Sequence, residues 1–256
     1  MDERLAAVIA PLRAERGRSA VVCDIDGTLA PIVPDPARSL LVPGALEALA
    51  ALAARLALVG CVSGRAAADA RRLVPLETVA LAGNHGLELW QEGRALVADE
   101  ARPFLDAVRA ARTECEADAR LHELGCTIED KGVTFTVHYR NAPDRDAARA
   151  YLDQVVATRI AAHGLAHAFG RMVLEARPPV AVDKGSALRR LTAGRVLAAL
   201  LYVGDDRTDL DAFREASIRI AVRSDEGPSE LIEAADAAVA SPGEVVALLR
   251  RLAEES

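Results

Sequence analysis

The feature that most limits how this chain can fold is a recurring unit: a short apolar run, a polar or glycine-containing turn, and a helical stretch. The first run, Ser19–Cys23, is rich in β-branched residues and ends at the turn Asp24-Ile-Asp-Gly-Thr28. An alanine- and leucine-rich stretch at helical spacing follows Gly44, and a second apolar run over 56–62 closes on Ser63. Strand, helix and strand in this order predict the right-handed crossover unit of a parallel sheet.

The same unit recurs later in the chain. Further helices are expected over 66–73, 184–193 and 208–215, and further strands over 78–82 and 196–203. The strands stop at Asp24, Ser63, Gly83 and Gly204. Because open α/β sheets bind ligands at the carboxyl ends of their strands, we expect these turns to converge. The composition, 51% hydrophobic but only 3% aromatic, also favours helices packed on a buried parallel sheet.

The pattern changes between about residues 102 and 178. A charged helical stretch over 103–124 precedes the alternating segment 127–139, a second helix over 144–163 and a strand-like run over 172–176. The alternation over 133–139 is typical of a half-exposed antiparallel strand. We therefore expect an α+β domain over 102–178, inserted into an α/β core formed by residues 1–101 and 179–256.

Charge and hydropathy exclude several classes of protein. The net charge of −7 and the pI of about 5.4 argue against a nucleic-acid binder, because affinity for phosphate backbones depends on concentrated Lys and Arg. Residues 1–18 carry acids among apolar residues, which predicts an amphipathic helix rather than a secretory signal. Since no apolar run reaches membrane-spanning length, we expect a cytoplasmic protein with no membrane partner. None of these patterns specifies an oligomeric state.

The cysteines and histidines do not form a metal-binding pattern. The four cysteines, Cys23, Cys61, Cys115 and Cys126, contain no CxxC pair, so buried free thiols are expected rather than disulfides or zinc ligands. His163 and His167 have the i, i+4 spacing of a metal pair, but Gly164 lies between them and no third ligand is evident. We expect both histidines to be structural or exposed.

The acidic pair Asp24 and Asp26 is the first candidate for chemistry. Alternate residues of a strand face opposite sides, but just after a strand end, with Gly27 loosening the turn, both carboxylates can face one site. Such a pair can divide the work, with Asp24 attacking phosphorus and Asp26 protonating the leaving oxygen and later activating water. The alternatives are a solvated acidic turn or a partial calcium loop, and residues 30–34 lack the further oxygen ligands of the latter.

A second acidic group, Gly204-Asp-Asp-Arg-Thr-Asp-Leu-Asp211, again follows an apolar strand. Mg²⁺ takes oxygen ligands, and carboxylates from two strand ends with a substrate phosphate would complete its shell. Asp205 is the first choice for direct ligation, and Asp206 and Asp209 are expected to surround the ion without binding it. The alternative is an acidic helix cap.

Two further residues are suited to a phosphate group. Ser63 beside Gly64 offers a hydroxyl and exposed backbone N–H groups, although a serine before a helix is also a common N-cap. Lys184, just before a predicted helix, could supply the positive charge that phosphoryl transfer needs, although a surface lysine is the alternative.

Taken in order, DxDGT, Ser-Gly-Arg, Lys-Gly and GDDxTD resemble the four signature motifs of the haloacid dehalogenase-like phosphatases. The resemblance implies a Rossmann-like parallel-sheet core with an inserted α+β cap domain that determines substrate specificity. It also implies a nucleophile, Asp24, an acid/base, Asp26, and phosphate contacts from Ser63 and Lys184. Mg²⁺ would be held by Asp24, the backbone carbonyl of Asp26 and Asp205.

Further blocks resemble one branch, the trehalose-6-phosphate phosphatases. They are Val62-Ser-Gly-Arg65, Gly83-Asn-His-Gly86, Glu129-Asp-Lys131, His138-Tyr-Arg140, Glu175 with Lys184-Gly185, and Gly204 to Phe213. Carboxylates and cations making paired hydrogen bonds suit an otherwise uncharged disaccharide. The implied substrate contacts are Gly64, Arg65, His85, Glu129, Lys131, Arg140, Arg171 and Glu175. Taken singly, those in the cap also fit a solvated sheet face. Two positions depart from the family's pattern, Leu210 where an acid is common and Arg171 where a lysine is common.

The resemblance predicts a hydrolase of trehalose biosynthesis that releases phosphate and trehalose from trehalose 6-phosphate. The enzymatic alternative is a phosphatase of another phosphosugar, of the sucrose-phosphate or mannosyl-phosphoglycerate type. The alternative from another class is a catalytically silent relative that serves as a binding module.

Overall fold

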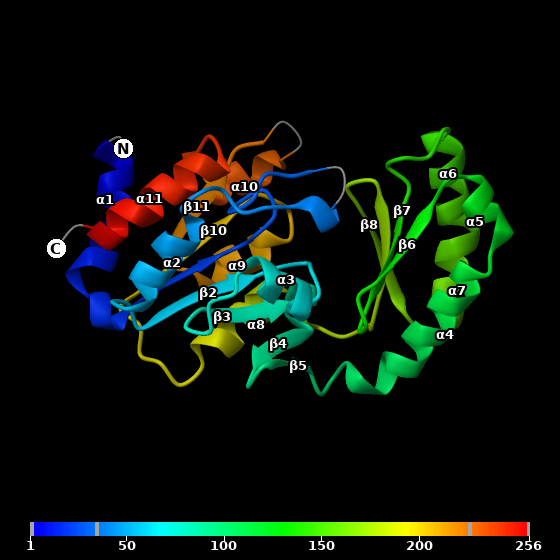
Figure 1. Ribbon diagram of the computed structural model, residues 1–256, viewed down its shortest axis with the longest axis horizontal. Coiled ribbons are helices and arrows are strands. Elements are labelled where there is room, and N and C mark those ends of the chain that lie inside the picture. Colours follow the sequence, from blue (N-terminus) through cyan, green and yellow to red (C-terminus); the bar gives the residue numbers. More distant parts are fainter. Residues whose placement is uncertain (1–2, 34–35, 225–226, 255–256) are drawn as a thin grey trace. The chain divides into compact units, whose positions relative to one another are not determined.

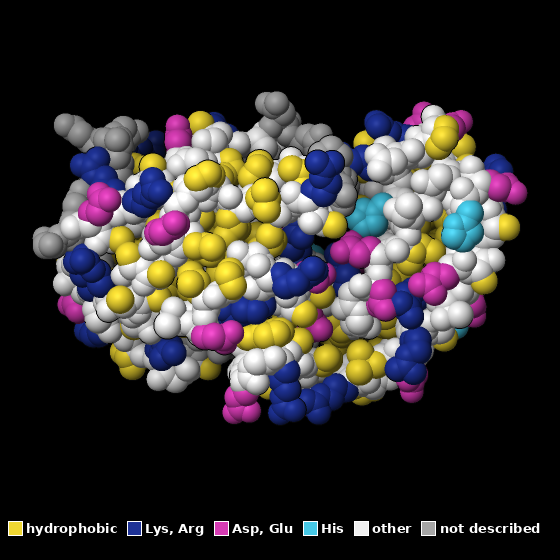
Figure 2. Space-filling view, viewed as in Figure 1, with side chains coloured by type: hydrophobic (Ala, Val, Ile, Leu, Met, Phe, Trp, Pro, Cys, Tyr) yellow, Lys and Arg dark blue, Asp and Glu magenta, His cyan; other side chains and the backbone are white. Residues whose placement is uncertain are grey.

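A computed structural model describes residues 3–33, 36–224 and 227–254, and the chain divides into two compact units (Figure 1). Unit 1 comprises residues 1–96 and 182–256, and unit 2 comprises residues 97–181. On the face drawn in Figure 2, acidic and basic side chains are interspersed. No helix in the described ranges is long and apolar enough to cross a membrane.

Unit 1 is built on one sheet of eight strands in the order β12-β11-β10-β1-β2-β3-β4-β5. The six strands from β12 to β3 pair in parallel, and β4 pairs antiparallel with β3. The bounds are β1 (Ser19–Cys23), β2 (Leu58–Val62), β3 (Ala80–Gly83), β4 (Glu88–Gln91), β5 (Arg94–Val97), β10 (Ala199–Gly204), β11 (Ile218–Val222) and β12 (Ala237–Val239). This sheet confirms the predicted α/β class with a parallel core.

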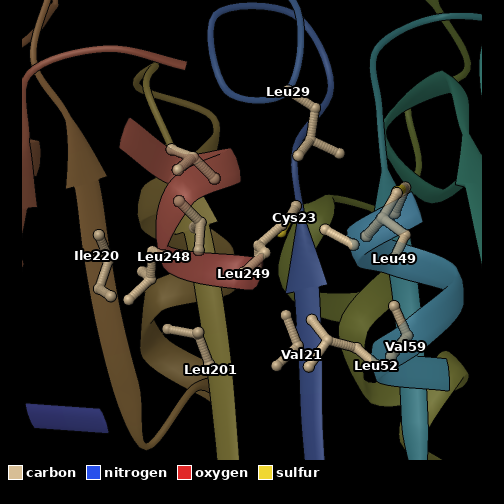
Figure 3. Packing of buried hydrophobic residues seen from close by; sticks show 14 of the residues in the cluster. Val21, Cys23, Leu29, Leu49, Leu52, Val59, Leu201, Ile220, Leu248 and Leu249 are labelled. Carbon is tan, nitrogen blue, oxygen red and sulfur yellow. The ribbon is translucent and has the colours of Figure 1, made fainter. Parts of the chain in front are cut away.

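Helices cover both faces of the sheet because its central strands are apolar on both sides. Val21 and Cys23 of β1 pack with α2 and α11, as Figure 3 shows, while Ala20 and Val22 face α8 and α9. The helices of unit 1 are α1 (Glu3–Ala14), α2 (Ala45–Ala53), α3 (Ala67–Leu73), α8 (Lys184–Thr192), α9 (Asp209–Glu215), α10 (Ser229–Ala234) and α11 (Pro242–Glu254). Full burial of a strand on both faces explains why the sequence shows continuous apolar runs here.

Unit 2 is an antiparallel sheet packed against helices. Its strands follow the order β6-β7-β9-β8, with bounds β6 (Thr127–Asp130), β7 (Phe135–His138), β8 (Ala166–Gly170) and β9 (Val173–Arg177). The helices are α4 (Leu105–Glu116), α5 (Ala119–Glu123), α6 (Arg145–Tyr151), a π-helical turn over Leu152–Val156, and α7 (Ala157–Ala162). One face of the sheet contributes Phe135, Val137 and Leu174 to a separate apolar core.

Two predictions for this region are wrong in detail. The single helix expected over 103–124 is two helices, because the Asp118 carboxylate accepts a hydrogen bond from the Arg120 N–H and starts α5. The alternating segment 127–139 forms an antiparallel hairpin, β6 and β7, with Gly132 at φ +76° in its turn. The antiparallel strand expected over 133–139 is present as β7, but its predicted exposure is wrong. Strand β7 is buried on both faces for most of its length, rather than half-exposed.

Candidate active site

Three neighbouring strands of unit 1 end in the residues that the motifs singled out. Asp24 follows β1, Ser63 follows β2, and Asp205 follows β10, with β1 lying between the other two strands. Backbone bonds extend the ladders past the strand ends: the Asp24 N–H donates to the Val203 carbonyl at 2.9 Å, and the Ser63 N–H donates to the Ala82 carbonyl at 2.9 Å. The predicted convergence therefore holds for these three turns.

A cluster of buried carboxylates lies at this edge of the sheet. Asp24, Asp205 and Asp209 are 4%, 1% and 0% exposed, and each offers an oxygen within 4.8 Å of the others. The Lys184 Nζ lies 2.7 Å from both Asp24 Oδ1 and Asp209 Oδ1. Lys184 is held at the start of α8 by a capping box in which the Asp183 carboxylate accepts from the Ser186 N–H.

The electrostatics of the cluster are dominated by burial. Burial raises the pKa of the Asp24 carboxyl well above its ordinary value; Lys184 lowers it, while Asp209 and Asp205 raise it further. Burial opposes the charge on Lys184 as well, but Asp209 and Asp24 outweigh that effect and hold the pKa of its ammonium above the ordinary value. One buried ammonium thus faces three buried carboxylates, and an additional cation would stabilise the ionised form of Asp24.

Asp209 is the most fully bonded member of the cluster. Its Oδ1 accepts from Lys184 and from the Tyr202 hydroxyl at 2.7 Å, and its Oδ2 accepts from the N–H groups of Asp205 and Asp206 at 2.9 Å. A side chain at Gly204 would collide with Asp209, since an added Cβ would lie 2.3 Å from its Cγ. Asp209 therefore fixes the turn that carries Asp205. Tyr202 was missed from the sequence, although a hydroxyl inside a buried strand needs a partner.

Asp206 does not belong to the carboxylate cluster. Its Oδ1 accepts a hydrogen bond from the adjacent Arg207 N–H at 2.6 Å. Of the two acids expected around the ion, Asp209 lies in the cluster with Asp24 and Asp205, and Asp206 is joined to Asp209 through its backbone N–H.

The donor set fits a hard divalent cation. The cluster offers only carboxylate oxygens, the ligands that Mg²⁺ prefers, and the adjoining lysine would contact phosphate oxygens rather than the metal. The backbone of Gly27 lies directly against the Asp205 carboxylate. Gly27 has φ +86°, and an added Cβ would lie 2.1 Å from Asp205 Oδ2. Glycine is required at this point of the DxDGT turn because any side chain would displace Asp205.

Asp26 points its carboxylate toward Arg65. Arg65 Nε lies 2.6 Å from Asp26 Oδ2 and its Nη2 lies 2.7 Å from Oδ1, and the Ser39 hydroxyl donates to Oδ1 at 3.3 Å. Arg65 was predicted as a substrate contact, and the structure shows it bonded to the predicted acid/base. This pairing brings the DxDGT and Ser-Gly-Arg turns together.

The Ser-Gly-Arg turn packs against the turn that carries His85. The His85 N–H donates to the Ser63 carbonyl at 2.9 Å, and an added Cβ at Gly64 would lie 2.7 Å from His85 Nε2. His85 itself has φ +55°, a left-handed conformation that is uncommon for a residue with a side chain. The buried Glu88 carboxylate fixes both turns, accepting from the Ala67 N–H and the Asn84 amide at 2.8 Å.

Two of the predicted sugar-reading residues of unit 2, Glu129 and Glu175, lie on the polar side of its sheet. Glu129 pairs with Thr136 across β6 and β7, and Thr136 pairs with Glu175 across β7 and β9. Directly opposed residues of antiparallel strands share a face, so these three form one row on the side opposite the apolar core. The Thr136 hydroxyl in the middle of this row is buried, and sequence reasoning missed it.

Contacts join further members of the predicted set. His138 Nε2 lies 2.8 Å from Glu129 Oε2, and Lys131 Nζ lies 3.9 Å from the same oxygen. Arg140 donates to the backbone carbonyl of Arg171 at 3.3 Å, which places these two arginines together. His138 was not selected from the sequence as a site residue. Its pairing with Glu129 becomes visible only when the strand register is known.

Unit 1 also contains a cavity of about 650 Å³ away from these turns. It lies beside the edge strand β12, and its lining includes Arg4, Arg223, Arg251 and Leu248. None of the predicted site residues lines it, so the cavity is not the candidate active site.

A parallel sheet with an aspartate pair after its first strand, a serine after the next, and a lysine and further carboxylates beside them defines a haloacid dehalogenase-like protein. A family model described as trehalose-phosphatase matches residues 22–242. The chain belongs to the trehalose-phosphatase family, which confirms the family predicted from the motifs.

Relatives in sequence agree with this family. A Mycobacterium tuberculosis protein named trehalose-phosphate phosphatase is 37% identical over 249 residues, which are 92% of this chain and 61% of that protein. A Mycobacterium tuberculosis protein named uncharacterized glycosyl hydrolase is 40% identical over 222 residues, 82% of this chain but 16% of that protein. The chain thus spans less than two thirds of the length of either relative.

Solved structures show the same fold. A crystal structure of a trehalose-6-phosphate phosphatase related protein has a TM-score of 0.78 and 24% identity, covering 91% of this chain and 96% of that one. The C-terminal domain of Candida albicans trehalose-6-phosphate phosphatase has a TM-score of 0.77 and 22% identity, covering 98% and 97%.

Proposed function

We propose that this protein is a Mg²⁺-dependent phosphatase that hydrolyses trehalose 6-phosphate to trehalose and phosphate. The observation that carries the proposal is the position of Asp24: buried at a strand end, 2.7 Å from Lys184, and within 4.8 Å of Asp205 and Asp209. Family membership and the polar face of unit 2 support the choice of substrate.

In the first step, an oxygen of the Asp24 carboxylate attacks phosphorus while the bond from phosphorus to the sugar oxygen breaks. Asp26 donates a proton to the leaving oxygen, so trehalose departs as a neutral alcohol. Lys184 and the Ser63 hydroxyl contact oxygens of the transferring group, whose negative charge they stabilise. The product of this step is an aspartyl phosphate on Asp24.

In the second step, water attacks the phosphorus of the aspartyl phosphate and the bond to the Asp24 oxygen breaks. Asp26, now a carboxylate, accepts a proton from the attacking water, and phosphate is released. The two steps together regenerate both carboxyl groups in their starting protonation states.

Asp24, Asp205 and the backbone carbonyl of Asp26 are the groups proposed to hold Mg²⁺. When bound, the ion neutralises charge on the phosphate and stabilises the ionised nucleophile. Asp209 holds the Asp205 turn and Lys184 in place, and we do not assign it as a ligand.

We propose that unit 2 recognises the sugar through the row of Glu129, Thr136 and Glu175 and the neighbouring cations. A disaccharide phosphate carries many hydroxyl groups, and carboxylates accept hydrogen bonds from them while Lys131 and Arg140 donate. This division gives residues 97–181 the role of a specificity domain.

The substrate assignment is tested by phosphate release from a panel of phosphosugars in Mg²⁺. We expect kcat/KM for trehalose 6-phosphate to exceed the values for sucrose 6-phosphate, glucose 6-phosphate and mannosyl-phosphoglycerate by at least about 100-fold, because each lost hydrogen bond to a charged group costs about 1.5–3 kcal/mol. A higher kcat/KM for another phosphosugar would support phosphatase activity but contradict the assignment of trehalose 6-phosphate as the substrate. No phosphate release from any of them would favour a non-catalytic relative.

A further inference from the structure

The strongest unassigned contact is the fork between Arg65 and Asp26. Two nitrogens of the Arg65 guanidinium meet the two carboxylate oxygens at 2.6 and 2.7 Å, the bidentate geometry in which arginine restricts the orientation of a carboxylate. A third nitrogen, Nη1, donates to the Pro36 carbonyl at 2.9 Å. The Arg65 side chain is 14% exposed, and that of Asp26 is 35% exposed.

The backbone of Arg65 is held as firmly as its side chain. Its N–H donates to the Ser63 hydroxyl at 3.2 Å, and its carbonyl accepts from the Asn84 N–H at 2.7 Å. An added Cβ at Gly83 would lie 2.8 Å from that carbonyl, so the strand end packs directly against it. A side chain anchored at both ends can act as a fixed reference for the group that it binds.

We propose that Arg65 is a positioning residue that orients Asp26 for proton transfer, rather than a ligand of the substrate phosphate. This inference rests on the proposed phosphatase chemistry. Arg65 holds the carboxylate plane through both oxygens. Oδ1 also accepts from the Ser39 hydroxyl, whereas Oδ2 keeps a lone pair that can carry the proton given to the leaving oxygen and later accept one from water. Loss of the fork would leave Asp26 with the longer bond from the Ser39 hydroxyl, at 3.3 Å, which does not fix both oxygens. A misdirected acid/base lowers turnover without weakening substrate binding.

A double-mutant cycle tests whether Arg65 acts through Asp26. The variants are Arg65→Gln, Asp26→Asn and the combination, with p-nitrophenyl phosphate as substrate and saturating Mg²⁺. We expect Arg65→Gln to lower kcat roughly ten- to a hundredfold, the size expected for losing hydrogen bonds to a charged group, with KM changed less than about threefold. The double variant should be no slower than Asp26→Asn alone, because residues that act as a unit are not additive.

Losses that multiply in the double variant, or a rise in KM as large as the fall in kcat, would overturn the proposal in favour of direct substrate binding. Arg65→Lys sharpens the test, because lysine keeps the charge but cannot form the planar fork. We expect it to rescue less than about a third of the lost kcat; full rescue would show that charge alone suffices and would overturn the positioning role. If Arg65→Gln lowers the melting temperature, the cycle is run with Arg65→Lys instead.

Two controls distinguish the role of Arg65 from the proposed phosphatase function and its substrate. Arg72→Gln, on an arginine of α3 whose side chain is 78% exposed, should leave kcat and KM unchanged. p-Nitrophenyl phosphate carries no sugar. If the wild type hydrolyses it but not trehalose 6-phosphate, the proposed substrate is contradicted, and the Arg65 proposal can still be tested. A wild type that hydrolyses neither would overturn both.

Discussion

The two units differ in where they place the side chains that we propose to be functional. In unit 1 the key groups lie just after the ends of parallel strands or, for Lys184, at the start of α8, and they are almost fully buried: Asp24, Lys184 and Asp205 are 4%, 3% and 1% exposed. In unit 2 they lie on one face of an antiparallel sheet or just beyond a strand end, as Glu129 and Lys131 do, and these two side chains are 34% and 13% exposed. Burial strengthens electrostatic interactions and suits bond breaking, whereas a partly exposed polar face suits recognition by many weaker hydrogen bonds. Substitutions in the two units should therefore differ in how much activity they remove and in which substrates they affect.

The largest effect is expected for the nucleophile. Asp24→Asn keeps the shape of the side chain but removes the attacking carboxylate, so turnover should fall by roughly 10⁴-fold or more on every phosphate ester. The measurement is phosphate release from trehalose 6-phosphate and from p-nitrophenyl phosphate, with circular dichroism to check the fold. Activity above a few per cent of wild type would remove Asp24 from its role.

The next largest effect concerns the metal. Asp205→Ala should raise the Mg²⁺ concentration needed for half-maximal activity by at least about tenfold, since a ligating carboxylate is lost. Chelation should silence the wild type, with Mg²⁺ restoring activity and Ca²⁺ restoring little because its longer bonds misplace the reacting groups. Asp206→Ala is the matched comparison, and we expect it to shift the Mg²⁺ requirement far less. Full activity in excess chelator would refute the metal requirement.

A smaller and more selective effect is expected in unit 2. Glu129→Ala and Glu175→Ala should each lower kcat/KM for trehalose 6-phosphate by about ten- to a hundredfold, because losing a hydrogen bond to a charged group costs about 1.5–3 kcal/mol. Hydrolysis of p-nitrophenyl phosphate should change little, since it has no sugar to recognise. Glu123→Ala, on an exposed acid of α5, is the control. Equal losses on both substrates would indicate damage to the chemistry or the fold instead.

The smallest effect on catalysis, but a clear one on stability, is expected at Asp118. Its carboxylate accepts from the Arg120 N–H and the Tyr151 hydroxyl and pairs with Arg159, each at 2.9 Å, so it links three helices of unit 2. Asp118→Asn should lower the free energy of unfolding by about 1.5–3 kcal/mol, the usual value for bonds to a charged group. Calorimetry of the whole chain measures this loss, and Asp153→Asn, an exposed acid of the same unit, should change it by less than about 0.5 kcal/mol.

The Asp118 carboxylate also predicts how the stability of the protein changes with pH. Burial opposes ionisation of Asp118, but the bonds from Tyr151 and Arg159 outweigh it and hold its pKa below the ordinary value. Its contribution is therefore complete above the unfolded-state pKa of about 3.9 and is lost as the pH falls through the lower folded-state value. The wild type should lose more stability than Asp118→Asn in that acidic range. Equal losses in both proteins would contradict this assignment.

The sequence predicted unit 1 better than unit 2 for a physical reason. Asp24, Ser63 and Asp205 each follow an apolar run directly, so strand and site are encoded by neighbouring residues. The row of Glu129, Thr136 and Glu175 depends on which residues of three strands lie opposite one another, and register is not visible in any one segment.

Side-chain contacts between loops were the least predictable feature of unit 1. Each turn of the Arg65–Asp26 pair was recognised, but their direct bond depends on how two loops fold against each other. The break in the helix over 103–124 was missed because Asp118 reads equally well as an exposed helical acid or as an N-cap, and only its hydrogen bond decides between them.

In the proposed mechanism, phosphate passes from trehalose 6-phosphate to Asp24 before water releases it. The most direct measurement is rapid acid quenching of the wild type during turnover of substrate carrying a radiolabelled phosphate, followed by identification of the labelled peptide. We expect transient label on the peptide that contains Asp24, and none in Asp24→Asn. Label on the peptides that contain Ser63 or His85, or label that persists in Asp24→Asn, would contradict the claim.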